Sequence, residues 1–299
     1  MTATDVRIDA DAEPVAARTP WPAALLGLIR RYPLGAAGAL VVLLMIFAAV
    51  FADVIVPYDP EDNYYEYMFT PPGAQYWLGA DDFGRDIFSR LIYGARSALF
   101  VGFVAAIIGA TGGLVLGVAS AYFGGWFDLV VQRVMDVIMA FPLIILALAV
   151  VSVLGPGIEK VIIAITIPFI PQCARVVRSS ALAIREIPYV DAARACGFSH
   201  SRIILRHMVP NVMAPFLIMI TAFVGQAILL EATLSYLGLG VQEPIPAWGL
   251  MLKSGAEEYA ESAPWIPIFP GIAISLAVFG FNLFGDALRD ALDPKLRAQ

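Results

Sequence analysis

The amino-acid sequence predicts an all-α integral membrane protein with six transmembrane helices. Hydrophobic residues make up 60% of the 299 residues and charged residues only 15%, with a mean hydropathy of +0.78, which is far from the composition of soluble globular proteins. Several stretches of about 20 residues or more contain no Asp, Glu, Lys or Arg, and that length is enough to cross a bilayer as a helix. Lys and Arg are concentrated in alternate connections between these stretches.

The apolar stretches are expected to be helical, because only a helix satisfies its own backbone hydrogen bonds where water is absent. The six stretches are residues 32–52, 97–127, 137–158, 161–174, 208–230 and 262–285. The third is expected to extend backward towards Trp126. The fourth is short and contains Pro168 and Pro171, but Lys160 and Arg175 flank it and their long side chains can reach the membrane interface.

The positions of Lys and Arg predict the orientation, since the cytoplasmic loops of membrane proteins are enriched in both. They cluster before the first stretch, between the fourth and the fifth, and after the sixth. Both termini are therefore expected in the cytoplasm. The predicted organisation is a cytoplasmic tail (1–31), a first transmembrane helix (32–53), an extracytoplasmic loop (54–95), a core with five transmembrane helices (96–290) and a short cytoplasmic tail (291–299).

Composition and motifs exclude several classes of function. A net charge of −6 leaves no basic surface for nucleic acid. Cys173 and Cys196 stand in no metal-ligand or disulfide pattern, so no metal site is expected. No lysine stands in the Gly-x-x-x-x-Gly-Lys-Ser/Thr pattern that cradles phosphates, so this chain is not expected to hydrolyse ATP or to have catalytic residues.

Few ionisable residues fall within the predicted spans. Arg133 and Asp136 are three residues apart on one helical face, where they can neutralise each other or bind a neighbouring helix. We expect a structural pair rather than a proton relay. Gly109, Gly113 and Gly117 recur every four residues in the second stretch, a spacing that allows close helix packing.

The connection formed by residues 175–210 has the pattern helix, break, helix. Pro188 can open a helix that runs to Ala195, Gly197 is placed to end it, and Ser199 or Ser201 can cap a second helix. The first helix contains Asp191, Ala192, Ala193 and Arg194, and Pro210 follows later in the connection. Small residues beside an acid on a short exposed helix suit insertion into a cleft on another protein.

The loop before the second stretch contains a second motif, made of Gly84, Arg85, Asp86, Arg90 and Arg96. We expect a local network of salt bridges and helix capping there, although contact with a soluble partner is the alternative. The predicted outer loops are also rich in carboxylates. This acidic surface is compatible with a solvated face and with a docking surface for a soluble partner.

Together these motifs resemble the permease subunits of ATP-binding-cassette importers, specifically the C-type permease of the dipeptide, oligopeptide and nickel family. The cytoplasmic signature of such permeases is Glu-Ala-Ala, three residues, Gly and a later Pro, and Asp191 replaces its Glu here. Further blocks carry the resemblance. They are residues 78–86, 89–90, 94–96, 231–240, 247–249 and 285–294.

The resemblance implies the type I importer permease fold in the bacterial inner membrane, with a coupling helix between spans 4 and 5. Residues Asp191, Ala192, Ala193, Arg194, Gly197 and Pro210 would belong to the ATPase-coupling element. The implied partners are a homologous second permease, two ATP-binding subunits that hold ATP and Mg²⁺, and an extracytoplasmic solute-binding protein. This chain itself would be a transport subunit that binds no cofactor.

Short peptides are the expected solute, with nickel or another small solute as the alternative within the same family. A stand-alone secondary transporter is a rival from another class, and the scarcity of ionisable residues in the spans argues against it. An intramembrane enzyme would need a Ser/Lys, paired Asp or His-Glu-x-x-His arrangement within the spans, and none is visible.

Overall fold

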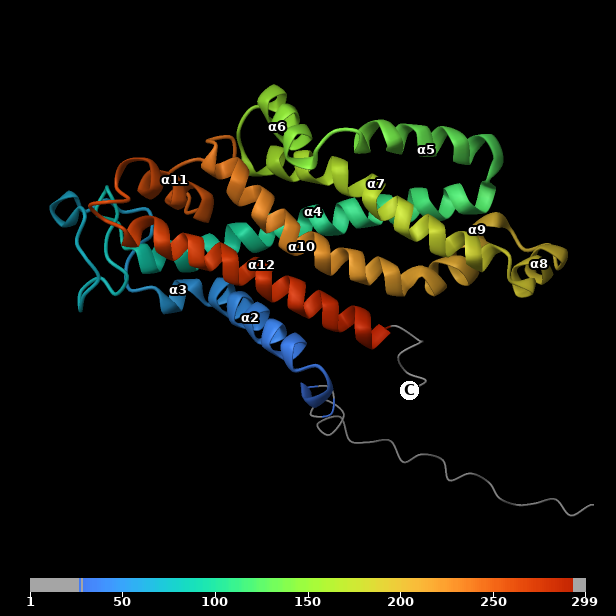
Figure 1. Ribbon diagram of the computed structural model, residues 1–299, viewed down its shortest axis with the longest axis horizontal. Coiled ribbons are helices and arrows are strands. Elements are labelled where there is room, and N and C mark those ends of the chain that lie inside the picture. Colours follow the sequence, from blue (N-terminus) through green and yellow to red (C-terminus); the bar gives the residue numbers. More distant parts are fainter. Residues whose placement is uncertain (1–26, 28, 293–299) are drawn as a thin grey trace, which may run out of the picture. The chain divides into compact units, whose positions relative to one another are not determined.

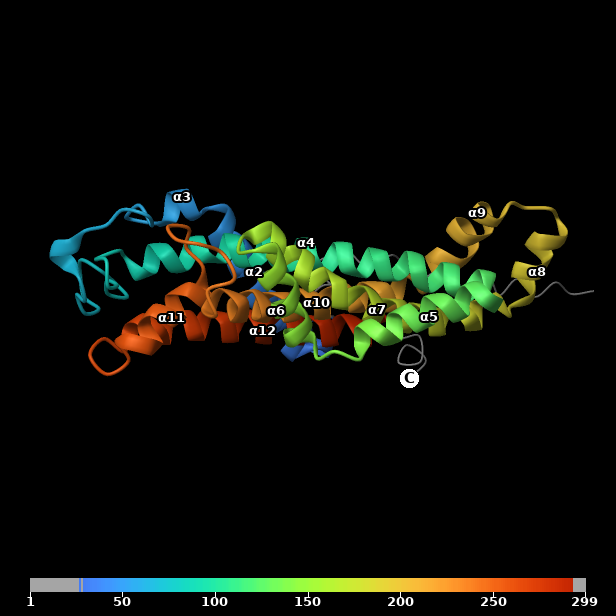
Figure 2. The same ribbon diagram turned by 90° about the horizontal axis from the view of Figure 1, so that it is seen from above.

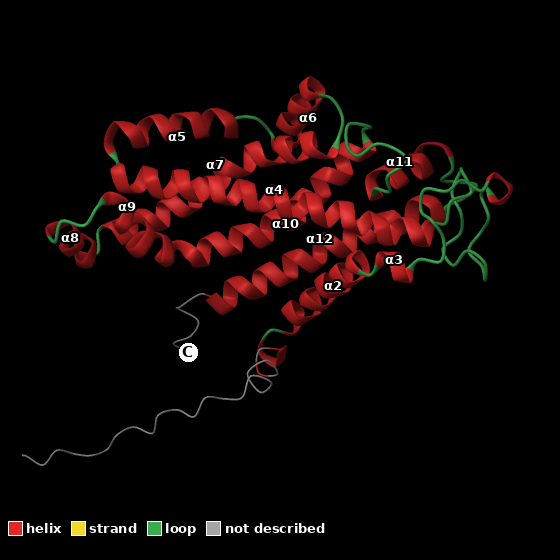
Figure 3. Ribbon diagram, turned by 180° about the vertical axis from the view of Figure 1, so that it is seen from behind, coloured by secondary structure: helices red, strands yellow, loops and turns green. Residues whose placement is uncertain are grey.

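The computed structural model describes residue 27 and residues 29–292 of the chain. Within this part of the chain every regular element is a helix, and the only strand-like pairing is an isolated bridge between Ala80 and Asp86 (Figure 3). Five helices are long and apolar enough to cross a membrane, and two helices joined by a bend form a sixth candidate span. The predicted all-α membrane fold is confirmed.

The chain divides into two units at the boundary between Pro33 and Leu34, and among the described residues of the first the Arg31 guanidinium lies 5.7 Å from the centre of the Tyr32 ring. Most of the predicted tail 1–31, and residues 293–299 of the predicted tail 291–299, lie outside the described residues. The remaining residues, 34–299, form the second unit, which contains the helical core.

The core is built from α4 (Ile87–Phe123), α7 (Ile158–Arg185), α10 (Met213–Tyr236) and α12 (Trp265–Leu292). The contact between α4 and α7 is the most extensive of all helix pairs, and α10 packs on α4, α7 and α12 (Figure 1). α2 (Pro33–Val50) runs beside α12, where a Cβ on Gly38 would come within 2.7 Å of the Gly280 carbonyl oxygen. These helices account for the first, second, fourth, fifth and sixth predicted spans.

α4 begins ten residues before the charge-free stretch that starts at residue 97, and it contains Arg90 and Arg96. Both charges have partners, since Arg90 is buried among acceptors and Arg96 forms an exposed ion pair with Asp53. Gly124, with a φ of +64°, ends the helix. A span that is predicted from the absence of charge is therefore too short at this end.

The third predicted span is not one straight helix. α5 (Gly125–Met139) and α6 (Leu143–Leu154) are bent by 87° relative to each other. Pro142 lies at the break and takes an extended conformation as the N-cap residue of α6, which stops the helix from continuing. The apolar stretch 137–158 thus includes the end of α5, the break and all of α6.

α7 is longer than the predicted fourth stretch and continues through both of its prolines. Pro168 and Pro171 are buried, and between them Phe169 stacks on Phe223 of α10 with ring centres 4.1 Å apart. Packing on both sides compensates for the helical hydrogen bonds that the prolines cannot donate.

The long loop before α4 has little regular structure apart from α3 (Ala52–Ile55) and η1 (Tyr65–Tyr67). Its core is Tyr76, which is 2% exposed and packs against the rings of Tyr58 and Tyr67. This aromatic cluster explains how a mostly irregular loop is held in place.

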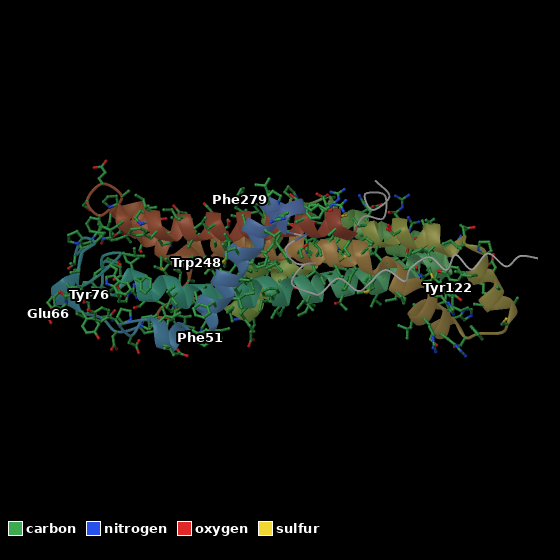
Figure 4. All side chains as sticks on the ribbon, turned by 90° about the horizontal axis from the view of Figure 1, so that it is seen from below. Phe51, Glu66, Tyr76, Tyr122, Trp248 and Phe279 are labelled. Carbon is green, nitrogen blue, oxygen red and sulfur yellow. The ribbon has the colours of Figure 1, made fainter. Side chains whose placement is uncertain are left out.

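An additional helix, α11 (Trp248–Glu258), lies in the loop between the fifth and the sixth predicted spans. Its first residue anchors it, because the Trp248 indole donates a hydrogen bond to the Leu91 carbonyl of α4 at 2.9 Å. α11 lies at one end of α4, and α8 (Pro188–Ala195) and α9 (His200–Ile203) lie at the other (Figure 2). Tyr76 lies near the end of α4 that is close to α11, and Tyr122 lies near the end that is close to α8 (Figure 4).

Candidate functional site

The helix predicted between Pro188 and Ala195 is present as α8, with the predicted bounds. Pro188 occupies the first turn, where the missing N–H costs no helical hydrogen bond. At the other end Gly197 has a φ of +75°, its N–H donates to the Arg194 carbonyl, and the Phe198 N–H donates to the Ala193 carbonyl. This pair of hydrogen bonds is the Schellman closure, which favours glycine at that position.

α8 has one face against the protein and one face open. Val190 and Ala193 are buried, whereas Asp191, Ala192 and Arg194 are exposed. The Arg194 guanidinium donates to the Asp191 carboxylate at 3.0 Å along the exposed face. A Cβ added at Gly197 would meet no atom within 4 Å. The exposed side of α8 therefore presents a small side chain, Ala192, and a pair of opposite charges.

Hydrogen bonds fix the start of α8 to the segment that leads into α10. The Tyr189 hydroxyl donates to the His207 carbonyl at 3.1 Å, and the Asn211 amide donates to both the Tyr189 oxygen and the His207 carbonyl. Phe198, just after α8, stacks on the His207 ring and carries the Arg202 guanidinium 4.0 Å above its centre. α8 is thus held at both of its ends.

The second attachment is Tyr122, in the last turn of α4. Its hydroxyl shares a 2.7 Å hydrogen bond with Nδ1 of His200 in α9, and the Arg194 guanidinium lies 5.2 Å from the centre of its ring. Tyr122 is 6% exposed. Tyr122 thus attaches both α9 and the Arg194 side chain of α8 to the longest helix of the core.

Pro210 lies apart from α8, in the short 3-10 turn η3 (Val209–Val212) that precedes α10. It follows the π-helical turn η2 (Ile204–Met208), in which one extra residue widens the helix. Ser199 occupies the N-cap position of α9, as one of the two predicted alternatives, but its side chain makes no capping hydrogen bond.

At the opposite end of α4, the second motif is an ionic cluster in which two buried arginines share an exposed carboxylate. Arg85 pairs with Asp81 and with Glu243, each at 2.7 Å, and Arg90 lies 3.3 Å from the same Glu243 carboxylate. Arg90 also donates to the Pro60 carbonyl at 2.8 Å. These bonds join the loop before α4 to the loop between α10 and α11.

Two other members of that motif have local structural roles. The Asp86 carboxylate accepts from the Ser89 N–H at 2.8 Å and so caps the start of α4. Gly84 has a φ of +76°, and a Cβ there would lie 1.8 Å from the Tyr64 carbonyl oxygen, so only glycine fits. Arg96 is not part of the cluster, because it pairs with Asp53 at 2.7 Å.

The carboxyl groups in this loop differ in their electrostatic environment. Burial, reinforced by the charge of Asp81, raises the pKa of Asp82 above its ordinary value. Burial also raises the pKa of Asp86, against the opposing hydrogen bonds from Ser89. In contrast, the hydrogen bond from Arg96 lowers the pKa of Asp53.

Gly109, Gly113 and Gly117 of α4 all face α7. A Cβ on Gly109 would lie 2.6 Å from the Phe169 Cβ, one on Gly113 would lie 2.5 Å from the Cys173 Cβ, and one on Gly117 would lie 2.6 Å from the Ala174 carbonyl oxygen. The absence of side chains at these positions permits the close approach of α4 and α7.

Arg133 and Asp136 of α5 are on one face, but they are not each other's main partners. Their closest nitrogen and oxygen atoms are 4.0 Å apart, whereas Arg175 of α7 donates to the Asp136 carboxylate at 2.8 Å. About two turns of α5 closer to Gly125, Arg178 binds Asp128 through two hydrogen bonds of 2.7 and 2.5 Å. α5 is thus attached to α7 by two ion pairs.

The sequence did not identify Glu243, Tyr122 or Arg175 as partners in these groups. The sequence predicts Arg175 in the connection that follows the fourth span, and Glu243 is 158 residues from Arg85. Tyr122 carries no charge and stands in no motif. None of the three has a local signal, because each acts through a contact between distant segments.

Comparison with known proteins identifies the family. Residues 113–298 match the family described as binding-protein-dependent transport system inner membrane component. Residues 22–72 match the N-terminal transmembrane domain of oligopeptide transport permease C.

Two relatives extend over nearly the whole chain. The dipeptide transport system permease protein of Alkalihalophilus pseudofirmus is 42% identical over 94% of this chain and 91% of its own length. The glutathione transport system permease protein of Escherichia coli O6:K15:H31 is 44% identical over 95% of this chain and 94% of its own length.

The fold also matches a solved structure. A chain of the inward-facing MetNI methionine ABC transporter aligns with a TM-score of 0.55 at 19% identity, over 68% of this chain and 96% of that chain. The helical core is thus that of an importer permease, as the resemblance implied. The chain belongs to the family of binding-protein-dependent transport system inner membrane components.

Proposed function

We propose that this chain is a permease subunit of an ATP-driven importer of short peptides in the bacterial inner membrane. The observation that carries the proposal is α8, a short exposed helix that is fixed at both ends to the core. Motion applied to its exposed face would reach α4 through Tyr122 and α10 through His207. Relatives named for dipeptide and glutathione transport support peptides as the solute.

In this proposal the exposed face of α8 lies in a groove of an ATP-binding subunit. Asp191, Ala192 and Arg194 offer small side chains and paired charges to such a groove. ATP and Mg²⁺ would be held by two such subunits, which supply the energy. Closure of these subunits would push α8, and the packed helices would convert this push into a change of access to the transport pathway.

The complete assembly would also contain a homologous second permease and an extracytoplasmic solute-binding protein. The binding protein would deliver peptide at the end of α4 that carries the Arg85 and Glu243 cluster. The N- and C-termini, together with α8, would face the cytoplasm. The peptide would then pass between the two permeases.

The first test is purification of the tagged chain in a mild detergent, followed by mass spectrometry and an ATPase assay of the co-purifying proteins. We expect a second permease, ATP-binding subunits and ATPase activity. Recovery of this chain alone, inserted and folded but without ATPase activity, would favour a carrier that works by itself.

Three substitutions test the role of α8. Asp191→Arg should abolish peptide uptake, since it reverses the exposed charge and repels Arg194, whereas Asp191→Glu should retain uptake because it keeps the charge. Gly197→Asp should also abolish uptake, because it adds a charged side chain beside the docking face. Membrane insertion should be unchanged in all three variants. Normal uptake by Asp191→Arg with the ATP-binding subunits still attached would disprove the coupling role.

A further inference from the structure

Three charged side chains lie along the seam between α5 and α7. They are Arg133 and Asp136 of α5 and Arg175 of α7, and their side chains are 79%, 48% and 53% exposed. The other ion pair between these helices, Arg178 with Asp128, is better covered, since its side chains are only 26% and 19% exposed. The seam therefore presents charge outward.

The seam lies deep within a candidate span. Trp126, at the start of α5, is 79% exposed, and exposed tryptophans of membrane proteins concentrate at the membrane interface. Asp136 follows it by ten residues, which is about 15 Å along a helix axis. That distance is about half of the 30 Å hydrocarbon core of a bilayer.

Contact of this surface with lipid is unfavourable, because exposing a charged side chain to hydrocarbon costs several kcal/mol. α5 already has a separate surface that suits lipid. Phe127 and Val134 are 42% and 52% exposed, and they lie about 180° and 160° around the helix from Asp136. α5 thus has an exposed side without charge, whereas the side that carries Arg133 and Asp136 needs water or protein beside it.

The break between α5 and α6 independently indicates that water or protein, and not lipid, lies beside this part of the chain. Ala140, Phe141 and Pro142 are exposed at the 87° bend, just beyond Asp136. Irregular backbone at membrane depth is tolerated only where protein buries it or where it lines a water-filled cavity. The break and the charged seam are therefore expected to share one environment.

The seam has an excess of positive charge, with two guanidinium groups and one carboxylate. Asp136 is engaged mainly by Arg175 at 2.8 Å, while Arg133 is 4.0 Å from it and more exposed. A guanidinium group can bind a carboxylate through two parallel hydrogen bonds. Arg133 can therefore accept a second, mobile carboxylate, and every short peptide with a free C-terminus carries one.

We propose that the α5–α7 seam lines the aqueous transport pathway and that Arg133, beside Arg175, binds the C-terminal carboxylate of the peptide in transit. This inference rests on the proposed function. It assigns to Arg133 a contact with the solute, and to the Asp136–Arg175 pair the role of positioning the seam.

The first experiment measures transport by the complete importer in vesicles, with the binding protein saturated. A dipeptide with a free carboxylate is compared with its C-terminal amide. Arg133→Gln should slow transport of the free acid by about tenfold, as expected for loss of one charge-assisted contact, and should leave the amide unchanged. Arg133→Lys should retain most of the preference for the acid. Arg289→Gln, an exposed arginine in the last turn of α12, is the matched control.

Equal slowing of the acid and the amide by Arg133→Gln, or no slowing of either, would overturn the carboxylate contact. Failure of the wild-type importer to transport either peptide would instead contradict the proposed function. The two failures are therefore distinguishable.

The second experiment tests access to water with a cationic thiol reagent on the assembled importer. It compares Ala140→Cys, on the charged side of α5, with Val134→Cys, on the apolar side, in a Cys196→Ser background that retains the buried Cys173. Ala140→Cys should react at least about tenfold faster than Val134→Cys, because thiolates form readily only in water. This is expected even though residue 140 is farther than residue 134 from Trp126, and therefore farther from the membrane interface. Peptide in transit should slow its reaction.

Equal reaction of both cysteines would overturn the assignment of a pathway. An unreactive Ala140→Cys would also overturn it, because the seam would then be covered by another subunit.

Discussion

Asp53 and Asp82 are both on the loop side of α4, yet the structure perturbs their ionisation in opposite directions. Asp82 has a buried carboxylate oxygen, Oδ1, without a hydrogen-bond partner, and burial raises its pKa. Asp53 accepts hydrogen bonds from Arg96 and from the Tyr93 hydroxyl, and the bond from Arg96 lowers its pKa. The two residues should therefore contribute to the pH dependence of stability with opposite signs.

We expect Asp82→Asn to raise the stability of the purified protein at neutral pH. A carboxyl group whose pKa is raised on folding destabilises the native state once the pH exceeds its ordinary value, and this penalty grows until the pH passes the raised value. Asparagine has no such penalty. The gain in thermal unfolding temperature should therefore shrink as the pH falls towards about 4, the ordinary pKa of aspartate.

Asp53→Asn provides the control with the opposite sign. A carboxyl group whose pKa is lowered on folding stabilises the native state above its ordinary value, and this contribution is lost as the pH falls through the lowered value. The variant should be less stable than the wild type at neutral pH, and the difference should shrink in acid. A constant difference at every pH for both variants would contradict the assigned environments.

Between elements, the contact of α4 with α7 depends on the glycines of α4. Gly113→Ala would place a Cβ 2.5 Å from the Cys173 Cβ and 2.8 Å from the Ala174 backbone nitrogen. Backbone atoms cannot move aside easily, so the helices would separate, at a cost of about 1–3 kcal/mol of unfolding free energy. Thermal unfolding in detergent measures this loss.

Gly112→Ala is the matched control, one residue away on the same helix. Its Cβ would lie 3.1 Å from Cγ1 of Ile170, a side chain that can move. Alanine also favours the helix over glycine by up to about 1 kcal/mol. The control should therefore be neutral or slightly stabilising. An equal loss in both variants would show that the α4–α7 contact does not depend on Gly113.

α8 shows which elements the sequence can predict. Its bounds follow from Pro188 and Gly197, whose backbone preferences act within a few residues and need no knowledge of the rest of the chain. The start of α4 and the break after α5 could not be predicted in this way. The former depends on partners that pair with Arg90 and Arg96. The latter falls at Pro142, but a proline alone does not decide a break, because α7 continues through Pro168 and Pro171.

For the whole molecule, hydropathy predicted the spans because each apolar stretch must satisfy its backbone hydrogen bonds alone. The ionic cluster is beyond such a prediction, since Glu243 meets Arg85 and Arg90 only after α4, α10 and α11 have packed together. The sequence predicts part of the α5–α7 seam. Arg133 and Asp136 were recognised, but their partner Arg175 lies on another helix.

The proposed orientation of the molecule can be tested with thiol labelling in cells. Cys196 is exposed beside α8, and Cys173 is buried. With the ATP-binding subunits absent, a membrane-impermeant thiol reagent should label Cys196 in inverted vesicles and not in intact cells. Trp77→Cys, at a position that is 60% exposed in the loop before α4, should show the opposite pattern. Labelling of Cys196 in intact cells would reverse the proposed topology.

The unbroken course of α4 has a mechanical consequence. Arg90 near its start and Tyr122 near its end are 32 residues apart, or about 48 Å along one helix axis. A tilt of about 5° around the midpoint of such a rod moves its ends by about 2 Å in opposite directions. A rigid tilt of α4 can therefore couple the two faces of the membrane. Contacts around one end of the helix would open while contacts around the other end close, and no additional element would be needed to connect them.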